Sequence, residues 1–183
     1  MAFEHLNING VFSFTPTVFT DSRGYFFESY NENVFAESSN AIRFVQDNQA
    51  FSSYGVLRGL HYQVGEFAQA KLVRALSGEI LDVIVDLRRN SATFGKTLSV
   101  LLSAENKKQL YVPRGFAHGY IVLSKTAEIL YKCDNFYHKS SERGIIFNDK
   151  TLAIDWQVPE SSFIISEKDL ALGNFDPAQT EFE

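Results

Sequence analysis

The sequence predicts an all-β fold, an antiparallel sandwich or jelly roll with one or two short helical pieces. Its aromatic residues are 17 Phe and 8 Tyr against a single Trp, and hydrophobic residues make up 45% of the chain. Aromatic side chains fit the pleated, half-buried surface of a strand. Short apolar runs recur at near-regular spacing between Gly, Asn, Ser and Pro residues, which is typical of sandwiches and barrels. At 183 residues the chain is most economically one domain, residues 1–183, with a sizeable core.

The first quarter of the chain contains short candidate strands and one candidate helix. Residues 11–15 alternate between apolar and polar side chains, and residues 25–30 follow a turn signal that contains Gly24. Asn31 is a favourable N-cap for a short helix over residues 32–38. An extended pattern then resumes at Phe44.

The centre of the chain carries the clearest strand pattern. Ser77-Gly78 is a hairpin signal between two of these strands, and Asp82 and Asp86 interrupt an otherwise apolar run. The tail, residues 154–183, mixes Pro, Ser and acidic residues, and we expect it to wrap the surface of the barrel. The strands expected in the centre cover residues 71–76, 79–87, 96–102, 109–112, 116–123 and 128–136.

Composition limits the partners and the compartment. The formal net charge of −5 gives no general affinity for nucleic acid, so any anion site has to be a local basic cluster. The single Cys133 excludes an internal disulfide and a multi-cysteine metal site, and it fits a reducing compartment. The N-terminus lacks the pattern of a signal peptide, and no apolar run is long enough to span a bilayer. We therefore expect a cytoplasmic protein without a nucleic-acid or membrane partner.

The most informative stretch is residues 55–63, which Lys71 follows. It places a fixed cation, Arg58, a titratable imidazole, His61, and a second cation, Lys71, on neighbouring backbone among glycines and apolar residues. Arginine and lysine suit a polyanionic ligand, and an imidazole moves a proton near neutral pH. The combination predicts proton chemistry on a phosphorylated substrate. From the residues alone, a histidine that is simply satisfied inside a barrel explains His61 equally well.

Six motifs follow one another along the chain and together carry a family resemblance. They are Asp21-Ser22-Arg23-Gly24-Tyr25-Phe26-Phe27-Glu28, Phe44-Val45-Gln46-Asp47-Asn48, Arg58-Gly59-Leu60-His61-Tyr62-Gln63, Ala70-Lys71-Leu72-Val73-Arg74, Pro113-Arg114-Gly115-Phe116-Ala117-His118-Gly119 and Ile165-Ser166-Glu167-Lys168-Asp169. The chain closely resembles the dTDP-4-dehydrorhamnose 3,5-epimerases, which act on a dTDP-4-keto-6-deoxyhexose on the way to dTDP-L-rhamnose. The resemblance implies a cupin-type double-stranded β-helix (jelly roll) with short peripheral helices, and a homodimer. It is less specific for the member, because 3-epimerases, 5-epimerases and relatives acting on other nucleotide sugars share most of these residues.

The resemblance assigns four catalytic residues. His61 matches the general base, and Asp169 orients it, because a carboxylate bonded to one ring nitrogen fixes the tautomer and makes the other nitrogen a better base. Tyr131 matches the acid on the opposite face of the sugar, since epimerisation removes a proton from one face of a carbon and returns one to the other. A phenol serves if nearby charge favours the phenolate. Lys71 would stabilise the enolate, because loss of the C3 or C5 hydrogen leaves negative charge on the C4 oxygen.

Each of these residues also has an ordinary structural reading. Asp169 taken alone is a surface acid or a helix cap, and Lys71 alone is an exposed lysine at the start of a strand. Tyr131 alone is a strand tyrosine with its hydroxyl at the rim of the barrel. The occurrence of all of them in family order favours the functional reading.

The resemblance also implies ten substrate-binding residues. Arg58 and Arg23 bind the diphosphate with help from Lys168, because the planar guanidinium suits phosphate oxygens. His118 lies close to the sugar, and Tyr137 stacks on the thymine. The other positions match contacts to nucleotide or sugar, and they are Glu28, Gln46, Asp47, Asn48 and Glu142.

Metal ions and cofactors are not expected. The spacing from Pro113 to His118 resembles the second motif of metal-binding cupins, but His61 is followed by Tyr62 and Gln63 where those proteins supply a histidine pair. His61, His118 and a carboxylate meeting in space are the remaining route to a metal. No Gly-rich dinucleotide fingerprint or P-loop is present, and proton transfer beside a ketone needs no redox cofactor.

The function predicted from the sequence is metal-independent epimerisation. The substrate would be dTDP-4-dehydro-6-deoxy-D-glucose, inverted at C3 and C5 to give dTDP-4-dehydro-L-rhamnose. Two alternatives stay within the enzyme class: a mono-epimerase that inverts only C3 or only C5, and a ketoisomerase-like relative acting on a related nucleotide sugar. An alternative of another class is a cupin that binds nucleotide sugars without catalysis.

Overall fold

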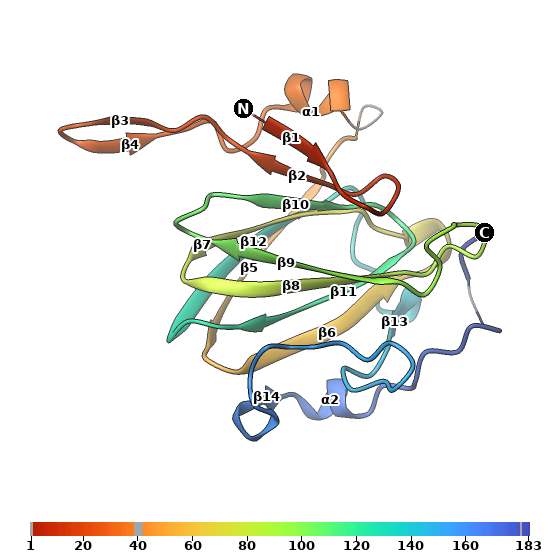
Figure 1. The fold of residues 1–183 in the computed structure, drawn as a ribbon. Helices are drawn as coiled ribbons and strands as arrows, with labels where there is room; N and C mark the ends of the chain where they lie inside the picture. Colours follow the sequence, from red (N-terminus) through yellow and green to blue (C-terminus); the bar gives the residue numbers. More distant parts are fainter. Residues whose placement is uncertain (1, 39–41, 180) are drawn as a thin grey trace.

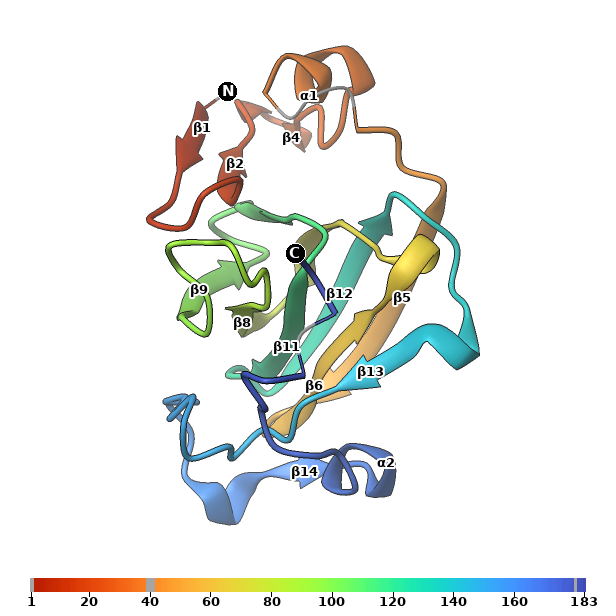
Figure 2. The same ribbon diagram turned by 90° about the vertical axis from the view of Figure 1, so that its right-hand side faces the viewer.

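Two largely antiparallel β-sheets pack face to face and form the body of the protein, as Figure 1 and Figure 2 show. The structure is a computed structural model, and it describes residues 2–38, 42–179 and 181–183. The first sheet contains, in spatial order, β1 (Ala2–His5), β2 (Phe12–Thr15), β10 (Gln109–Val112), β7 (Lys71–Ser77), β12 (Thr126–Cys133) and β5 (Gln46–Ser53). The second contains β13 (Glu142–Gly144), β6 (Val56–Gln63), β11 (Phe116–Val122), β8 (Glu79–Asp86) and β9 (Thr97–Ser103), with β14 (Ile164–Ile165) alongside β6.

Short elements lie outside the two sheets. A two-stranded hairpin, β3 (Phe19–Asp21) and β4 (Gly24–Phe26), projects from the body (Figure 1). The helices described are α1 (Glu32–Ser38), α2 (Glu167–Leu170) and the 3-10 turns η1 (Gly65–Phe67), η2 (Lys139–Ser141) and η3 (Glu160–Ser162). Among these described helices, none is long and apolar enough to cross a membrane.

Strand β8 shows how the core is layered. Ile80 and Ile84 point between the two sheets and are fully buried, while Leu81, Val83 and Val85 point to the outer face of the second sheet. That outer face is buried as well, because residues from Ile145 onward pack across it. Burial of each such side chain stabilises the fold by roughly 1.5–3 kcal/mol. Strand β8 is therefore apolar on both faces, and the tail wraps the barrel as expected.

Most of the expected central strands are confirmed with small changes at their ends. Strand β10 matches its expected range, and β12 begins two residues earlier than expected and ends at Cys133. Gly78 forms the expected turn with a φ of +69°, where a Cβ would collide with the Thr126 carbonyl. The expected helix over residues 32–38 is α1. The expected strand over residues 25–30 is wrong beyond Phe26, where the chain has no regular structure.

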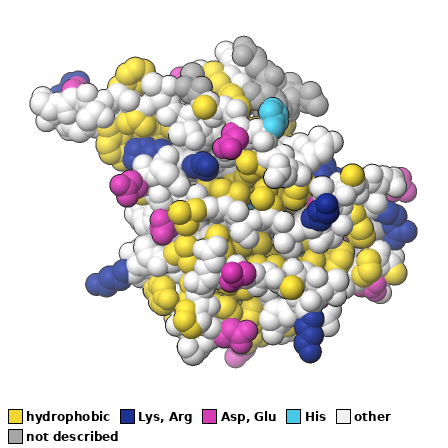
Figure 3. Space-filling model, viewed as in Figure 1, with side chains coloured by type: hydrophobic (Ala, Val, Ile, Leu, Met, Phe, Trp, Pro, Cys, Tyr) yellow, Lys and Arg dark blue, Asp and Glu magenta, His cyan; other side chains and the backbone are white. Residues whose placement is uncertain are grey.

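The surface on the face of Figure 1 carries mixed charge. In Figure 3 the Lys and Arg side chains are dispersed among Asp and Glu side chains, with apolar side chains between them. This face does not show the continuous basic stripe that binding to a nucleic-acid backbone requires.

Candidate active site

Two adjoining cavities, of about 340 Å³ and about 280 Å³, lie against the inner side of the barrel. His61, Lys71 and Tyr131 line both of them, and these residues come from three different strands, β6, β7 and β12. The first cavity also contains side chains from the loop after β12, and the second contains Arg58, His118 and residues of α2. A concave space with a few convergent polar groups is the usual form of a small-molecule site.

A backbone irregularity in β6 turns Arg58 and His61 toward the same side. Residues three apart on a regular strand point to opposite faces. Here the pairing of β6 with β11 shifts register between His118 and Tyr120, as in a β-bulge, and both side chains reach the cavities. Gly59, with a φ of +122°, lies at the shift, and a Cβ there would meet the backbone of Gly119.

The predicted pair of His61 and Asp169 is present. Nε2 of His61 lies 2.7 Å from Oδ1 of Asp169, whose carboxylate is almost fully buried. The other oxygen, Oδ2, accepts a hydrogen bond from the backbone N–H of Gly59 at 3.3 Å, and the Ser166 hydroxyl caps α2 by accepting from the Asp169 N–H. Because the carboxylate holds Nε2–H, the Nδ1 lone pair of the ring is left for another partner. Burial lowers the pKa of His61, with Asp169 opposing, so the neutral form of the ring predominates at neutral pH.

Lys71 and His118 contact each other across the cavity. Nζ of Lys71 lies 3.4 Å from Nδ1 of His118, whose Nε2 lies 2.8 Å from Oδ1 of Asp82. Burial lowers the pKa of Lys71 below its usual value. Nearby acidic groups, including Asp82, oppose this shift but do not outweigh it. The ammonium also lies 5.9 Å from the centroid of the Tyr131 ring. A cation and a phenol therefore face the same space as the imidazole of His61.

Tyr131 is a stronger base, and hence a weaker acid, than a free phenol. Burial raises its pKa to about 12, and the guanidinium of Arg58 opposes this. The charge expected to favour the phenolate is thus present in Arg58, but burial outweighs it. At neutral pH the hydroxyl keeps its proton, which is the form that a proton donor needs.

Arg58 forms no ion pair with a carboxylate of the described residues. Its Nε donates to the Ser52 hydroxyl at 3.2 Å, and the ion pairs of arginine in the described residues all belong to other arginines. Lys168, in contrast, donates to Glu142 at 2.6 Å. The hydroxyl of Tyr137 donates to the same carboxylate at 2.9 Å. The second cavity is thus bordered by one guanidinium that has no acidic partner among the described residues.

Strand β5 separates the predicted binding residues that it carries. Gln46 and Asn48 point to the first cavity, and the amide of Gln46 donates to the Asn48 side chain at 3.1 Å. Asp47, between them, points to the other face and pairs with Lys132 at 3.0 Å. Alternation along a strand explains this split.

Arg23 and Glu28 lie outside both cavities. Arg23 is in the projecting hairpin, with its side chain 88% exposed and paired with Asp21. Glu28 is exposed in the segment after β4 and lines neither cavity. Within one protomer the structure does not bring these two residues to His61.

Comparison with known proteins finds relatives that match nearly the whole chain. The family model described as dTDP-4-dehydrorhamnose 3,5-epimerase matches residues 5–176. The dTDP-4-dehydrorhamnose 3,5-epimerase of Shigella flexneri is 53% identical over 164 residues, 89% of this chain and 90% of that protein. The crystal structure of that enzyme from Elizabethkingia anophelis superposes with a TM-score of 0.92 at 56% identity and covers 96% of each chain.

The chain belongs to the dTDP-4-dehydrorhamnose 3,5-epimerase family. It is therefore an isomerase with a cupin-type jelly-roll fold, and both expectations are confirmed. A further member is the dTDP-6-deoxy-D-glucose-3,5-epimerase of Legionella pneumophila Philadelphia 1, solved in complex with dTDP-4-keto-L-rhamnose. Its TM-score is 0.90 at 44% identity, and the match covers 94% of this chain and 92% of that one.

Metal ligands do not gather in the described part of this epimerase. No group of three His, Cys, Asp or Glu residues there is placed to hold a metal ion. His61 and His118 are cross-strand partners, but each ring is bonded to its own carboxylate. The expectation of chemistry without a metal stays a prediction.

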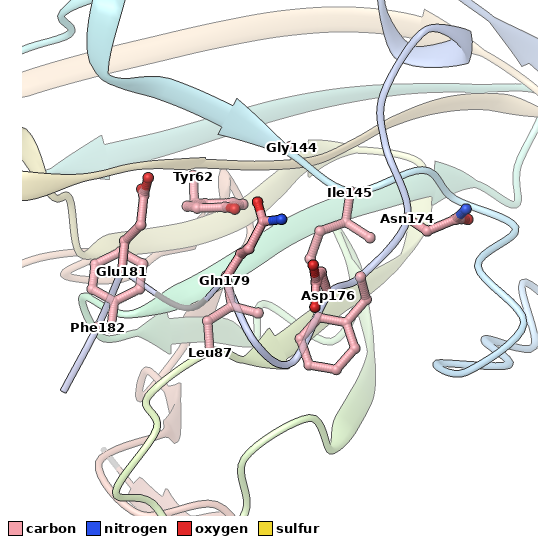
Figure 4. Close-up of a pocket in the computed structure, with 10 residues that line it drawn as sticks. Tyr62, Leu87, Gly144, Ile145, Asn174, Asp176, Gln179, Glu181 and Phe182 are labelled. Carbon is pink, nitrogen blue, oxygen red and sulfur yellow. The ribbon is translucent and has the colours of Figure 1, made fainter.

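A third cavity, of about 160 Å³, lies on the opposite side of β6 (Figure 4). Tyr62 forms one wall, and the C-terminal segment supplies most of the others, including Glu181 and Phe182. No residue of the predicted catalytic and binding set lines it. It separates the tail from the sheet rather than forming part of the candidate active site.

Two polar residues of the site were not predicted from the sequence. Asp82 and Tyr120 are cross-strand neighbours on β8 and β11, and both are buried beside the second cavity. The interruption of an apolar run by Asp82 was the available signal. It did not distinguish Asp82 from Asp86, which occupies the same face four residues later.

Proposed function

We propose that this protein inverts C3 and C5 of dTDP-4-dehydro-6-deoxy-D-glucose and releases dTDP-4-dehydro-L-rhamnose, in dTDP-L-rhamnose biosynthesis. The observation that carries the proposal is that His61, Lys71 and Tyr131 all line the same two adjoining cavities. A base, a cation and a weak acid are thereby presented to one bound sugar. The reaction as proposed uses neither a metal ion nor a redox cofactor.

His61 is the base in this mechanism. Its Nδ1 removes the proton from C3 or C5, which lie on either side of the C4 ketone. Asp169, 2.7 Å from Nε2, stabilises the imidazolium that forms and keeps the ring in the correct tautomer. The pKa of the ring, lowered by burial, supports a base that is ready at neutral pH.

Lys71 holds the enolate. As the C–H bond breaks, its electron pair moves into the ring and negative charge develops on the C4 oxygen. An ammonium already placed at that oxygen stabilises the transition state, and loss of one such donor typically costs about 100- to 1,000-fold in rate. The contact of Nζ with His118 supports this placement, because it restricts where the ammonium can point.

Tyr131 completes the inversion. Its O–H bond breaks as the new C–H bond forms on the opposite face of the sugar, and the phenolate then regains a proton from solvent. The raised pKa of Tyr131 supports this direction, since the phenol stays protonated until an enolate carbon accepts the proton.

The remaining residues anchor the nucleotide. Arg58 binds the diphosphate, and Lys168 joins it by exchanging Glu142 for a phosphate oxygen. Tyr137 stacks on the thymine, and His118 contacts the sugar. Contacts to nucleotide or sugar are also proposed for Gln46, Asn48 and Glu142, whereas Asp47, predicted with them, points away from the cavity and takes no part in the proposal. Binding energy from this remote part of the substrate positions the sugar for reaction.

A homodimer would give Arg23 and Glu28 their binding role. The hairpin that carries Arg23 projects from the body and exposes Phe19, Tyr25 and Phe26. Exposed apolar patches of this kind mark interaction sites. We propose that the hairpin packs against the partner protomer and brings Arg23 and Glu28 to the nucleotide bound there. We also propose that residues 1–183 form a single domain and that the enzyme is cytoplasmic.

The test is incubation of the purified protein with dTDP-4-keto-6-deoxyglucose in deuterium oxide. We expect deuterium at both C3 and C5 and the L-configured product. Label at one carbon alone would indicate a mono-epimerase, and conversion to a 3-keto sugar would indicate a ketoisomerase. No incorporation above a protein-free control, together with binding of dTDP in a titration, would indicate a binding protein and overturn the proposal.

His61→Ala is the matched variant for that experiment. It should abolish incorporation while binding of the sugar nucleotide survives. His138→Ala is its control, because the ring of His138 stacks on Phe67 and lines neither cavity. Turnover at the wild-type level in His61→Ala would rule out the proposed base.

A further inference from the structure

Strand β8 carries two fully buried carboxylates, and only one of them has a complete set of partners. Asp86 is held by Arg88, Ser91 and Thr93, with donor–acceptor distances of 2.6 to 2.8 Å for the closest contact of each. These groups belong to the segment that leads from β8 to β9. Asp86 therefore has a sufficient structural explanation, as the anchor of that connection.

Asp82 has no comparable structural explanation. Its exposure is 0%, and among the described residues it has a single hydrogen bond, in which Oδ1 accepts from Nε2 of His118 at 2.8 Å. The second oxygen, Oδ2, makes no hydrogen bond to any described residue. Burying a carboxylate with one oxygen unpaired is costly, and a native protein keeps such a group for a reason. Its side chain points between the sheets, on the same side as the candidate active site.

The partner of Asp82 connects it to that site. A carboxylate only accepts hydrogen bonds, so the Nε2 of His118 that faces it carries the proton. In the neutral ring this leaves a lone pair on Nδ1, which lies 3.4 Å from Nζ of Lys71. The ammonium then donates one N–H to His118, and its other N–H groups remain free for the cavity. Three residues on β8, β11 and β7 form one directed chain.

We propose that Asp82 is a positioning residue: it holds His118 in the Nε2–H tautomer, and His118 in turn holds the Lys71 ammonium toward the C4 oxygen of the substrate. The role of Lys71 in this chain rests on the proposed function, whereas the tautomer of His118 does not. Without Asp82 the ring can carry its proton on Nδ1. Two donors, Nδ1–H and the ammonium, would then face each other, and Lys71 would turn away.

The groups around Lys71 influence its pKa, and therefore the pH at which activity is lost on the alkaline side. Besides His118, polar or charged groups from four other strands face the ammonium or bear on its charge. These groups are Asp82 on β8, Tyr131 and Cys133 on β12, His61 on β6 and Glu142 on β13. Asp82 favours the charged form, so its removal moves the loss of the ammonium proton to lower pH.

The first measurement is the tautomer of His118, read from the ring ¹⁵N chemical shifts of the full-length protein. The His118 signals are assigned by their disappearance in His118→Asn. We expect the Nε2–H tautomer in the wild type, and a change toward Nδ1–H in Asp82→Asn, because the amide can donate to Nε2. An Nδ1–H tautomer in the wild type would overturn the proposal, and this result does not need an active enzyme.

The second measurement compares Asp82→Asn with Asp86→Asn. Loss of a residue that orients an active-site group typically costs about 10- to 100-fold in activity, and we expect a fall of that size in kcat for Asp82→Asn. Binding of dTDP should be unchanged, and the alkaline limb of the kcat profile should move to lower pH. Asp86→Asn should lower the melting temperature and leave that limb in place.

A double-mutant cycle then tests whether Asp82 acts through His118. If it does, adding Asp82→Asn to His118→Asn should have little further effect on kcat. Full additivity of the two losses would overturn the proposal, and so would wild-type kcat together with an unmoved alkaline limb in Asp82→Asn. A wild-type enzyme that fails to incorporate deuterium would count against the proposed function, while the tautomer measurement would still decide the role of Asp82.

Discussion

Asp169→Asn tests the proposed base through its partner. Oδ1 of Asp169 lies 2.7 Å from Nε2 of His61, so the carboxylate stabilises the imidazolium that forms as His61 takes a proton. Two unit charges about 4 Å apart attract by about 4 kcal/mol at an effective dielectric constant of about 20. The ring of His61 is 30% exposed, which weakens the attraction. A loss of about 3 kcal/mol in the transition state corresponds to a fall of about a hundredfold in kcat.

The same variant should move the acid limb of the pH profile of kcat/KM to lower pH. Burial lowers the pKa of His61, and Asp169 is the strongest group opposing that shift. Because His61 acts as a base, activity is lost as the pH falls through the pKa of the free enzyme. Without the carboxylate the pKa of His61 falls further. The acid limb of the profile therefore moves to lower pH, and the maximal rate on the plateau also decreases.

The assay is the rate of deuterium incorporation across the acidic pH range. Asp149→Asn is the matched control, because Asp149 is also a buried carboxylate but accepts from the backbone N–H groups of Thr151, Leu152 and Phe175. It should lower the melting temperature and leave the acid limb unmoved. Wild-type kcat and an unmoved limb in Asp169→Asn would refute the proposed pairing.

Three further substitutions test the rest of the site. Tyr131→Phe should retain deuterium exchange driven by His61 and lose the inverted product, and equal loss of both would exclude Tyr131 as the dedicated acid. Arg58→Lys should raise KM about tenfold, because the loss of one charge-assisted hydrogen bond costs about 1.5 kcal/mol, and an unchanged KM would place the diphosphate elsewhere. Gln63→Ala should raise KM and spare kcat, because the Gln63 amide joins two loops beside the first cavity through backbone groups at 2.6 to 3.1 Å. The control is Gln49→Ala on the outer face of β5, which should change neither KM nor kcat. A rise in the KM of Gln49→Ala as large as that of Gln63→Ala would exclude a special role for Gln63.

The strand pattern predicted the sheets where strands are apolar, and it failed where they are not. Strands such as β8 and β11 are buried on both faces and read as clear apolar runs. Strand β5, Gln46–Ser53, is mostly polar, because one of its faces lines a cavity and the other is exposed. It therefore has neither the alternation nor the apolar content of a typical strand. Strand β6 was not predicted as a strand, because its register shift breaks the alternation of side chains that a regular strand shows. Its residues were interpreted instead as a glycine-containing motif.

The site residues could be predicted from the sequence only in part. His61 and Lys71 stood out because their residue types are unusual in an apolar setting, and both line the cavities. The partner of His61 is 108 positions away along the chain, and no local pattern predicts a contact of that range. Asp169 was reached through the family resemblance alone. Arg23 was predicted in the same way, and within one protomer its exposed side chain pairs with Asp21.

The distance along the chain between His61 and Asp169 has a consequence for how activity arises in the cell. A ribosome makes His61, the proposed base, long before it makes Asp169, the carboxylate that pairs with it. Because the two lie 108 positions apart, synthesis at about 5–20 residues per second separates them by roughly 5 to 20 s. During that time the growing chain contains His61 but not the carboxylate of Asp169 that bonds its Nε2. A chain that stops before α2 would lack the carboxylate that pairs with His61, so we expect full activity only after translation has passed this point.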